Sequence, residues 1–419
     1  MKAKDSPTAW YGAMTPLERK TFWASFGGWT LNSIDFFLLI FAMPAIVVAL
    51  DLDRREAAHV ASATLIASAI GGWIAGIAAD RYGRVKVLQV TILWFAVFGL
   101  LCAFVQEYWQ LMACRILMAL GLGGEWAVGA ILIGEVVHAK DRGKAVGGMQ
   151  SGWAVGWAIA ALIAIFVLPK MRPDVSWRIL LALGILPALL IFFIRRYIEE
   201  PKIFLDTQKK LRGKKNREWD FLKIFSPDML KTTVMTTLLA AGTHGGYYTS
   251  AWLLDYLSSY RRITEMGTGR YIASIIGGAF VGYLVSAYLN DRIGRRPTFM
   301  LFAVGSAISV YVIVWLAAND HGVMFWGFML CMFASGTFSG IGPTLTEHFP
   351  THLRGSGQSF AYNGGRLLAA GIPTLLTFLS SRDSFNRIID MIAISAYALV
   401  FLIAWFMRET NGKKLTPSN

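Results

Sequence analysis

Long apolar stretches alternate with short polar ones along nearly the whole chain. A membrane-spanning helix needs about 20 mostly apolar residues, and the sequence contains twelve segments of this kind. They begin near Phe22, Ala57, Val87, Trp109, Ala145, Trp177, Lys231, Gly267, Phe299, Gly322, Gly357 and Asn386. The pattern therefore predicts an all-α integral membrane protein with 12 transmembrane helices.

The polar stretches predict how the chain is divided. The longest of them separates the sixth apolar segment from the seventh. We expect an N-terminal tail at 1–21, a six-helix bundle at 22–197, a central loop at 198–230, a second six-helix bundle at 231–407 and a C-terminal tail at 408–419.

The composition fits a protein that lies in a bilayer. Hydrophobic residues make up 55% of the 419 residues and charged residues only 16%, whereas soluble domains have roughly 45–50% and about 25%. The three cysteines, Cys102, Cys114 and Cys331, lie in apolar runs without metal-ligand spacing. We therefore expect no disulfide framework and no metal site.

The net charge of +14 reports membrane orientation. Most Lys and Arg residues fall in the segments on one side of the membrane, and the positive-inside rule makes that side cytoplasmic. Both termini are then cytoplasmic, and the expected location is the cell inner (plasma) membrane. The basic central loop contains Lys209, Lys210, Lys214 and Lys215, which are either solvated or in contact with anionic lipid. We expect no nucleic-acid partner.

Two motifs occur once in each half of the chain. Residues 80–84 read Asp-Arg-Tyr-Gly-Arg and residues 291–295 read Asp-Arg-Ile-Gly-Arg, an offset of 291 − 80 = 211. Glu135 precedes Arg142 by the same interval as Glu347 precedes Arg354, at an offset of 347 − 135 = 212. Two agreeing offsets of about half the chain predict two six-helix halves of parallel topology.

These motifs bring opposite charges to the cytoplasmic side of each half. We expect the glycines to form tight turns, each Asp to cap the helix that follows it, and Arg84 and Arg295 to pair with Glu135 and Glu347. Such pairs either break and reform as the bundles move, or only anchor loops. The candidate gating residues are Asp80, Arg81, Gly83, Arg84, Glu135, Arg142, Asp291, Arg292, Gly294, Arg295, Glu347 and Arg354.

The Asp-Arg-x-Gly-Arg turns give the chain a resemblance to the major facilitator superfamily, from about Phe22 to Met407. Residues 115–126, 135–143 and 150–156 are similar to the sugar-porter and metabolite:proton symporter branches. Among these, residues 123–126, 35–37 and 347–350 resemble the sialate:proton symporters, which include sialic-acid and lactate permeases. In the seventh span only Thr243 and His244 match the monocarboxylate permeases of that group, so the substrate stays open. The resemblance implies alternating access and a central cavity lined by the first, fourth, seventh and tenth helices.

Ionisable residues inside the bilayer cost about 2.5–3.5 kcal/mol each, so each calls for a function or a partner. Asp35 in the first span and Arg115 in the fourth match a pair that exchanges a proton in sugar:proton symporters. Glu125 and His244 are further candidates for proton coupling. The alternatives are a static brace for the pair, a satisfied protonated acid for Glu125 and a packed side chain for His244.

Arg366 is the predicted receptor for a substrate anion, because its guanidinium keeps its charge and can grip a carboxylate with two hydrogen bonds. If Arg366 instead neutralises an acid such as Glu125, the substrate can be uncharged. Other polar and aromatic side chains of the spans complete the candidate substrate site, namely Asn363, Tyr362, Tyr247, Tyr248, Trp252, Gln150 and Trp153.

We therefore expect a monomeric symporter that imports a small organic-acid anion, such as a monocarboxylate or a sialate, together with protons. Its energy source is the proton gradient, and no cofactor is expected. The alternatives are a sugar or aromatic-acid transporter, an efflux antiporter, or a membrane sensor or scaffold with the same fold. The chain lacks a phosphate-binding loop, a Gly-x-Ser-x-Gly elbow and a His-Glu-x-x-His motif, so we do not expect an enzyme.

Overall fold

A computed structural model describes residues 9–211, 220–260, 265–316, 320–372 and 385–415. Within these residues, ten helices are long and apolar enough to cross a membrane. Helix α11 and helix α15 complete the set of twelve that the sequence predicts. The helices begin one to six residues before the expected apolar segments, because most of them include a polar first turn.

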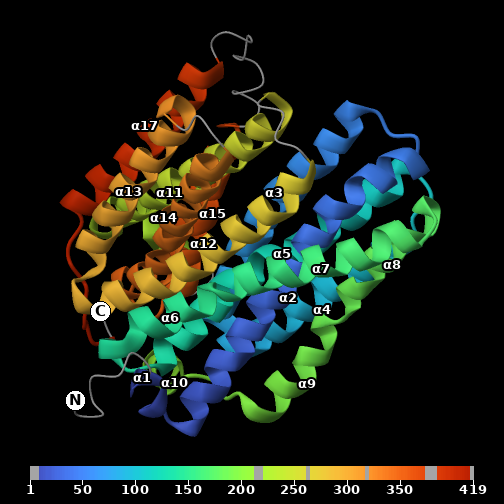
Figure 1. Ribbon diagram of the computed structural model, residues 1–419. Coiled ribbons are helices and arrows are strands. Elements are labelled where there is room, and N and C mark those ends of the chain that lie inside the picture. Colours follow the sequence, from blue (N-terminus) through green and yellow to red (C-terminus); the bar gives the residue numbers. More distant parts are fainter. Residues whose placement is uncertain (1–8, 212–219, 261–264, 317–319, 373–384, 416–419) are drawn as a thin grey trace.

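The first half of the chain forms one bundle, coloured blue to green in Figure 1. Its elements are α1 (Ala9–Gly12), α2 (Pro16–Ala49), α3 (Arg54–Tyr82), α4 (Arg84–Leu101), η2 (Cys102–Phe104), α5 (Tyr108–Val136), η3 (Ala139–Asp141), α6 (Arg142–Gln150), α7 (Gly152–Val167), η4 (Leu168–Lys170), α8 (Pro173–Ala182), η5 (Leu183–Ile185) and α9 (Pro187–Tyr197).

The second half forms a bundle beside it, coloured yellow to red in Figure 1. Its elements are α11 (Pro227–Tyr260), α12 (Glu265–Arg292), α13 (Arg295–Tyr311), η7 (Val312–Leu316), α14 (Asp320–His348), α15 (Arg354–Ala370) and α17 (Phe385–Phe406). The segment expected as a central loop contains α10 (Lys202–Leu211) and η6 (Asp220–Phe225), and Lys214 and Lys215 lie outside the described residues.

Local sequence explains where the first two long helices begin. Thr15 accepts a hydrogen bond from the backbone N–H of Glu18, and the Glu18 carboxylate accepts one from the backbone N–H of Thr15. Asp53 and Glu56 form the same reciprocal pair at the start of α3. Each capping box satisfies two backbone donors that a helix N-terminus leaves free.

Close helix packing in both halves depends on glycine. A Cβ atom added to Gly71 of α3 would lie 2.1 Å from the Leu120 carbonyl oxygen of α5, and one added to Gly282 of α12 would lie 1.9 Å from that of Met332 in α14. The two contacts are related by offsets of 282 − 71 = 211 and 332 − 120 = 212 residues. The internal repeat therefore extends from the motifs to the backbone contacts between helices.

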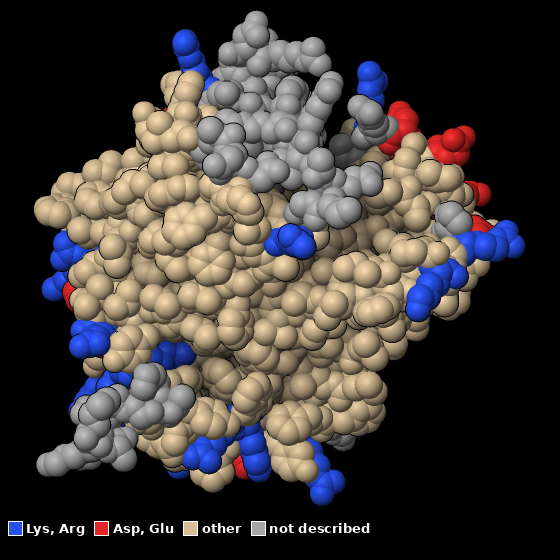
Figure 2. All heavy atoms as spheres, viewed as in Figure 1, with Lys and Arg blue, Asp and Glu red and all other residues tan. Residues whose placement is uncertain are grey.

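The two halves meet along helices at the centre of the molecule. Helix α15 packs on α3, and helix α12 packs on α6. The described chain begins and ends at the same end of the bundle, near α10. Figure 2 shows a broad band with few charged side chains, while Lys and Arg gather mainly along its lower and left edges. This distribution suits a protein whose middle lies in lipid.

Two neighbouring glycines allow a test of the packing. Gly278→Ala places its Cβ 2.3 Å from the Phe328 carbonyl oxygen, whereas Gly277→Ala meets only a Phe328 ring carbon at 3.8 Å. We expect Gly278→Ala to lower the free energy of unfolding by about 1–3 kcal/mol, the usual cost of overpacking, and Gly277→Ala to have little effect. Thermal unfolding in detergent measures both, and equal melting temperatures for the two variants would contradict this contact.

Candidate functional site

The motif end is the end of the bundle that contains both Asp-Arg-x-Gly-Arg turns. In the first half, Arg84 donates to both carboxylate oxygens of Glu135 at 3.2 and 3.1 Å and lies 3.2 Å from Asp80. In the second half, Arg295 donates to both oxygens of Glu347 at 3.2 and 2.8 Å and lies 2.7 Å from Asp291. The expected pairing of each motif arginine with its glutamate is therefore present in both halves.

The same carboxylates also bind arginines of the opposite half. Glu135 pairs with Arg354 at the start of α15, and Glu347 pairs with Arg142 at the start of α6, with an N–O distance of 2.9 Å. The Glu135, Glu347 and Arg84 side chains are fully buried. Each glutamate thus bridges one arginine of its own half and one of the other half.

The expected role of the motif aspartates in capping the next helix is wrong. Asp80 accepts hydrogen bonds from the backbone N–H groups of Gly355 and Ser356 at 2.8 and 2.7 Å. Asp291 accepts from those of Gly143 and Lys144, both at 2.8 Å. Each aspartate therefore caps a helix of the opposite half, because another carboxylate already accepts from the first N–H groups of the helix that follows it.

The helices after the turns are capped by two glutamates that the sequence analysis missed. Glu200 accepts from the backbone N–H groups of Arg84 and Val85 at 2.8 and 2.9 Å, and Glu409 accepts from those of Arg295 and Arg296 at 3.0 and 3.1 Å. Burial raises the pKa of Glu200 despite these bonds. The sequence feature that could have identified these two residues is an acidic side chain just after the last apolar segment of each half.

The other motif residues have simpler surroundings. Gly83 and Gly294 have φ values of 113° and 105°, a region that favours glycine, so the expected tight turns are present. Arg81 and Arg292 are exposed and lie over the rings of Tyr82 and Tyr288. Neither of these two arginines joins the buried network.

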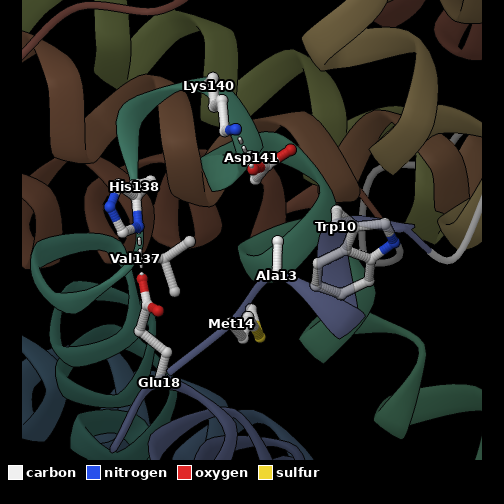
Figure 3. Close-up of a pocket in the computed structure, with 8 residues that line it drawn as sticks. All are labelled: Trp10, Ala13, Met14, Glu18, Val137, His138, Lys140 and Asp141. Carbon is white, nitrogen blue, oxygen red and sulfur yellow. Dashed lines mark hydrogen bonds and ion pairs between the residues drawn. The ribbon is translucent and has the colours of Figure 1, made fainter. Parts of the chain in front are cut away.

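A small pocket of about 110 Å³ lies at the motif end between α1 and the loop that precedes α6. Figure 3 shows its lining, with Trp10 and Met14 on one side and Lys140 and Asp141 on the other. His138 bonds Glu18 at 2.8 Å. This contact fixes the first turn of α2 against the loop that leads into Arg142.

In the middle of the first half, Asp35 and Arg115 form the predicted pair. Their nearest N–O distance is 3.7 Å, and both side chains are buried. Asp35 also lies against Gly99 and Gly184, so it is enclosed by α2, α4, α5 and η5. Asp35 Oδ2 and Arg115 Nε lack a hydrogen-bond partner among the described residues, so the two side chains are close but not tightly hydrogen-bonded.

Glu125 is buried against α2. Its carboxylate accepts a hydrogen bond from Asn32 at 3.2 Å, and a Cβ on Gly28 would lie 2.4 Å from Glu125 Oε1. No basic side chain of the described residues forms an ion pair with it. The alternative in which Arg366 neutralises Glu125 is thus not seen in this structure.

An aromatic cluster joins the two halves near the centre. Trp126 of α5 stacks on Tyr362 of α15 with ring centroids 3.5 Å apart and 19° between the planes. Trp126 donates to Gln150 at 2.7 Å, and Trp29 lies between Trp126 and Trp153. Gln150 and Trp153 therefore contact the part of this cluster that the first half of the chain contributes.

His244 lies on the other side of Tyr362. Its Nδ1 donates to the Ala240 carbonyl at 2.9 Å, and its ring packs against Tyr362 and Phe338. Tyr248 lies beside His244, and Tyr247 packs on Phe338. The side chain of Trp252 lies outside the described residues.

Arg366 extends from α15 toward the first half of the chain. Its Nη1 donates to the hydroxyl of Ser68 in α3 at 3.0 Å, and its guanidinium lies 5.0 Å from the Tyr362 ring centroid. No acid among the described residues forms an ion pair with it. Beside it, Asn363 is buried and its Oδ1 has no hydrogen-bond partner in the described part of the chain.

Two repeated six-helix halves, joined at one end by buried ion pairs and near the centre by aromatic and polar side chains, have the architecture of a multi-pass membrane transporter. The profile of the Major Facilitator Superfamily matches residues 26–373 and 251–419. The chain belongs to the major facilitator superfamily, as its motifs predict.

Similar proteins agree with this assignment. The chain is 36% identical to a probable 4-methylmuconolactone transporter of Cupriavidus pinatubonensis, over 96% of this chain and 94% of that protein. It is 30% identical to the cis,cis-muconate transport protein of Acinetobacter baylyi, over 90% and 92% of the two chains. The solved structure of the proton:xylose symporter XylE superposes with a TM-score of 0.79 at 17% identity, covering 95% and 98%, which shows the shared fold.

The cap formed by Glu409 gives a pH-dependent prediction. Burial opposes its charge, but four backbone N–H groups donate to the carboxylate and hold its pKa below the ordinary 4.5. A group with a lowered pKa stabilises the fold above its unfolded pKa and loses that contribution as the pH falls. We expect Glu409→Gln to lower stability by about 1 kcal/mol at pH 7, as loss of a helix cap does, and by less below about pH 4.5.

Melting temperatures between pH 3.5 and 7 measure this difference. The control is Glu199→Gln, because Glu199 is exposed and its loss should leave the curve unchanged. A Glu409→Gln deficit that stays constant over the whole range would show that the carboxylate charge is not what stabilises the turn.

Proposed function

We propose that this transporter is a proton-coupled symporter that imports a small organic-acid anion by alternating access. The motif end faces the cytoplasm, with both termini on that side of the cell inner membrane. Residues 22–197 and 231–407 are the two moving bundles, residues 198–230 connect them, and 1–21 and 408–419 are tails. One chain suffices for transport.

The observation that carries the substrate class is the environment of Arg366. This half-buried guanidinium has a neutral hydroxyl and an aromatic ring as its neighbours, and no acid of the described residues neutralises it. An arginine cannot lose its charge by burial, so an incoming carboxylate can form an ion pair with this guanidinium. Asn363, with its buried unpartnered oxygen, can add a polar contact to a protonated group of the substrate.

Relatives support the same class. The name of the muconate transport protein states that it carries an organic acid. Residues 123–126, 35–37 and 347–350 resemble organic-acid symporters. The aromatic side chains of the central region, namely Tyr362, Tyr247, Tyr248 and Trp153, provide apolar walls of the kind that enclose small ligands. Gln150 has an indirect role in the proposed site. It accepts a hydrogen bond from the Trp126 indole and so fixes the orientation of that ring.

Proton coupling is assigned to the buried acids of the first half. Asp35 lies close enough to Arg115 for attraction but is not tightly bonded to it, so a proton can replace the arginine as its partner. Glu125 has an amide as its described partner and is the second acceptor. The Nδ1 of His244 is occupied by a backbone carbonyl, so its Nε2 is the atom left to exchange a proton or to contact substrate.

Release into the cytoplasm requires the buried network at the motif end to open. Each of the four arginines there bonds a glutamate or aspartate, and two of these pairs cross between the halves. Because the crossing pairs are the ones that separation of the bundles breaks, we assign Arg142, Arg354, Glu135 and Glu347 to the gate itself.

Arg366 provides the test of the substrate class. Arg366→Lys retains the positive charge but loses the planar fork, so the Kd for cis,cis-muconate or another bound carboxylate should rise at least tenfold. Arg172→Lys, at an exposed position, is the matched control. The measurement is calorimetry of the purified protein over a panel of organic acids and sugars. If neutral hexoses bind and no carboxylate competes with them, the organic-acid assignment is wrong.

Asp35 provides the test of coupling. Asp35→Asn cannot release a proton, so accumulation against a gradient should be lost in proteoliposomes with an imposed pH difference, while exchange of substrate across the membrane persists in part. Asp174→Asn, an exposed acid, should behave as the parent. Full concentrative uptake by Asp35→Asn would transfer the coupling role to Glu125 or His244.

A further inference from the structure

Helices α3 and α15 meet along one line of contacts that runs from the motif end toward the centre. A Cβ on Gly76 would lie 2.2 Å from Ser359 Oγ, and one on Gly72 would lie 2.3 Å from Asn363 Nδ2. At the motif end of this line, Asp80 accepts from the backbone of α15. The α3 positions are four residues apart, so they lie on one face of the helix.

At the centre of the molecule, the last contact of this line is the hydrogen bond between Arg366 and Ser68. Ser68 is the next α3 position on the same face, four residues before Gly72. Its side chain is 3% exposed, and its hydroxyl accepts from Arg366 at 3.0 Å. Polar contacts therefore join α3 to α15 at both ends of this line. One contact lies at the gate, and the other lies at Arg366, the arginine proposed to bind substrate.

The repeat-related position in the other half has no such bond. Adding 211 to 68 gives Ala279, and subtracting 212 from 366 gives Ala154. Both alanines are buried in one apolar cluster, where neither can respond to a charged ligand. The Ser68 contact is thus a specific feature of the α3 and α15 side of the molecule.

We propose that Ser68 is the resting partner of Arg366, and that an incoming carboxylate displaces it and thereby releases α15 from α3. The proposal rests on the substrate class assigned above. A carboxylate can accept two parallel hydrogen bonds from a guanidinium and also carries the opposite charge, whereas the neutral Ser68 hydroxyl accepts one, so a carboxylate competes successfully with it. Substrate binding then removes one of the two polar ends of the contact line and makes opening of the motif end easier.

A permanent carboxylate at position 68 tests the contact without any substrate. Ser68→Asp should hold Arg366 in an internal ion pair and keep the motif end closed, whereas Ser68→Asn has the same size and no charge. Spin labels at Tyr82→Cys and Ile293→Cys report the separation of the halves, because these exposed residues occupy equivalent positions. Cys102, Cys114 and Cys331 are replaced by serine in the full-length chain, which is reconstituted in nanodiscs.

The expected distances follow from the proposal. Ser68→Asp should show only the short distance, with or without cis,cis-muconate. The parent should shift toward the long distance when cis,cis-muconate or another carboxylate that binds it is added. If Ser68→Asp and Ser68→Asn give the same distance distribution when cis,cis-muconate or another bound carboxylate is present, the Ser68 contact does not hold the halves and the proposal is overturned.

A second variant measures the competition directly. Ser68→Ala leaves Arg366 without its resting partner, so the Kd for the bound carboxylate should fall about three- to tenfold. Ser306→Ala is the control, because among the described residues that buried hydroxyl bonds only the carbonyl of Phe302 in its own helix. An unchanged Kd for Ser68→Ala overturns the proposal even where Arg366→Lys abolishes binding and the proposed function holds.

Failure of the proposed function has a different signature. If Ser68→Asp locks the short distance but no carboxylate binds the parent or changes its distances, the lock between Ser68 and Arg366 is upheld and the organic-acid assignment is the part that fails.

Discussion

Charges buried between the two bundles must be paired, and this requirement holds the structure closed at the motif end. Asp80, Glu135, Asp291 and Glu347 each contact an arginine of their own half. Each also contacts a backbone or a guanidinium of the opposite half. Removing one member of a buried pair typically costs 3–5 kcal/mol, so the halves cannot separate here unless the whole network finds new partners or water.

The internal geometry of each half could be predicted from the sequence because the repeat encodes it. The offsets of 211 and 212 residues relate the Arg84 and Glu135 pair to the Arg295 and Glu347 pair, and the structure contains both. The twelve helices follow from the length of the apolar runs. The pairing of Asp35 with Arg115 followed from two costly charges in spans that the family resemblance places side by side.

Contacts between the halves could not be predicted in this way. Hydrophobic periodicity states which face of a helix is buried but not which helix of the other bundle covers it. The Asp80 carboxylate was therefore assigned to the nearest helix N-terminus in sequence, whereas it caps α15 more than 270 residues away. Ser68 could not be singled out for the same reason, because a single serine in an apolar helix has no evident role until its contact with Arg366 is known.

Glu200 and Glu409 were missed for a related reason. Each lies more than 110 residues after the turn that it caps, and the sequence places it in a polar connection or tail where acids are common. Their burial against Gly83 and Gly294 is what distinguishes them. A Cβ on either glycine would lie within 2.6 Å of the glutamate carboxylate, so the glycine is needed both for its positive φ and for the close approach of the cap.

One helix connects the coupling pair, the centre and the gate. Helix α5 contains Arg115, Trp126 and Glu135, which bond or stack with Asp35, Tyr362 and Arg354 respectively. The 135 − 115 = 20 residues between its first and last contact span about 30 Å at 1.5 Å per residue. An α-helix of this length moves largely as a unit, so any displacement of Arg115 also displaces the stack on α15 and the crossing ion pair. Under the proposed mechanism, in which a proton on Asp35 frees Arg115, this helix is what links proton binding in the first half to Arg366 in the second half without any contact between Asp35 and the substrate.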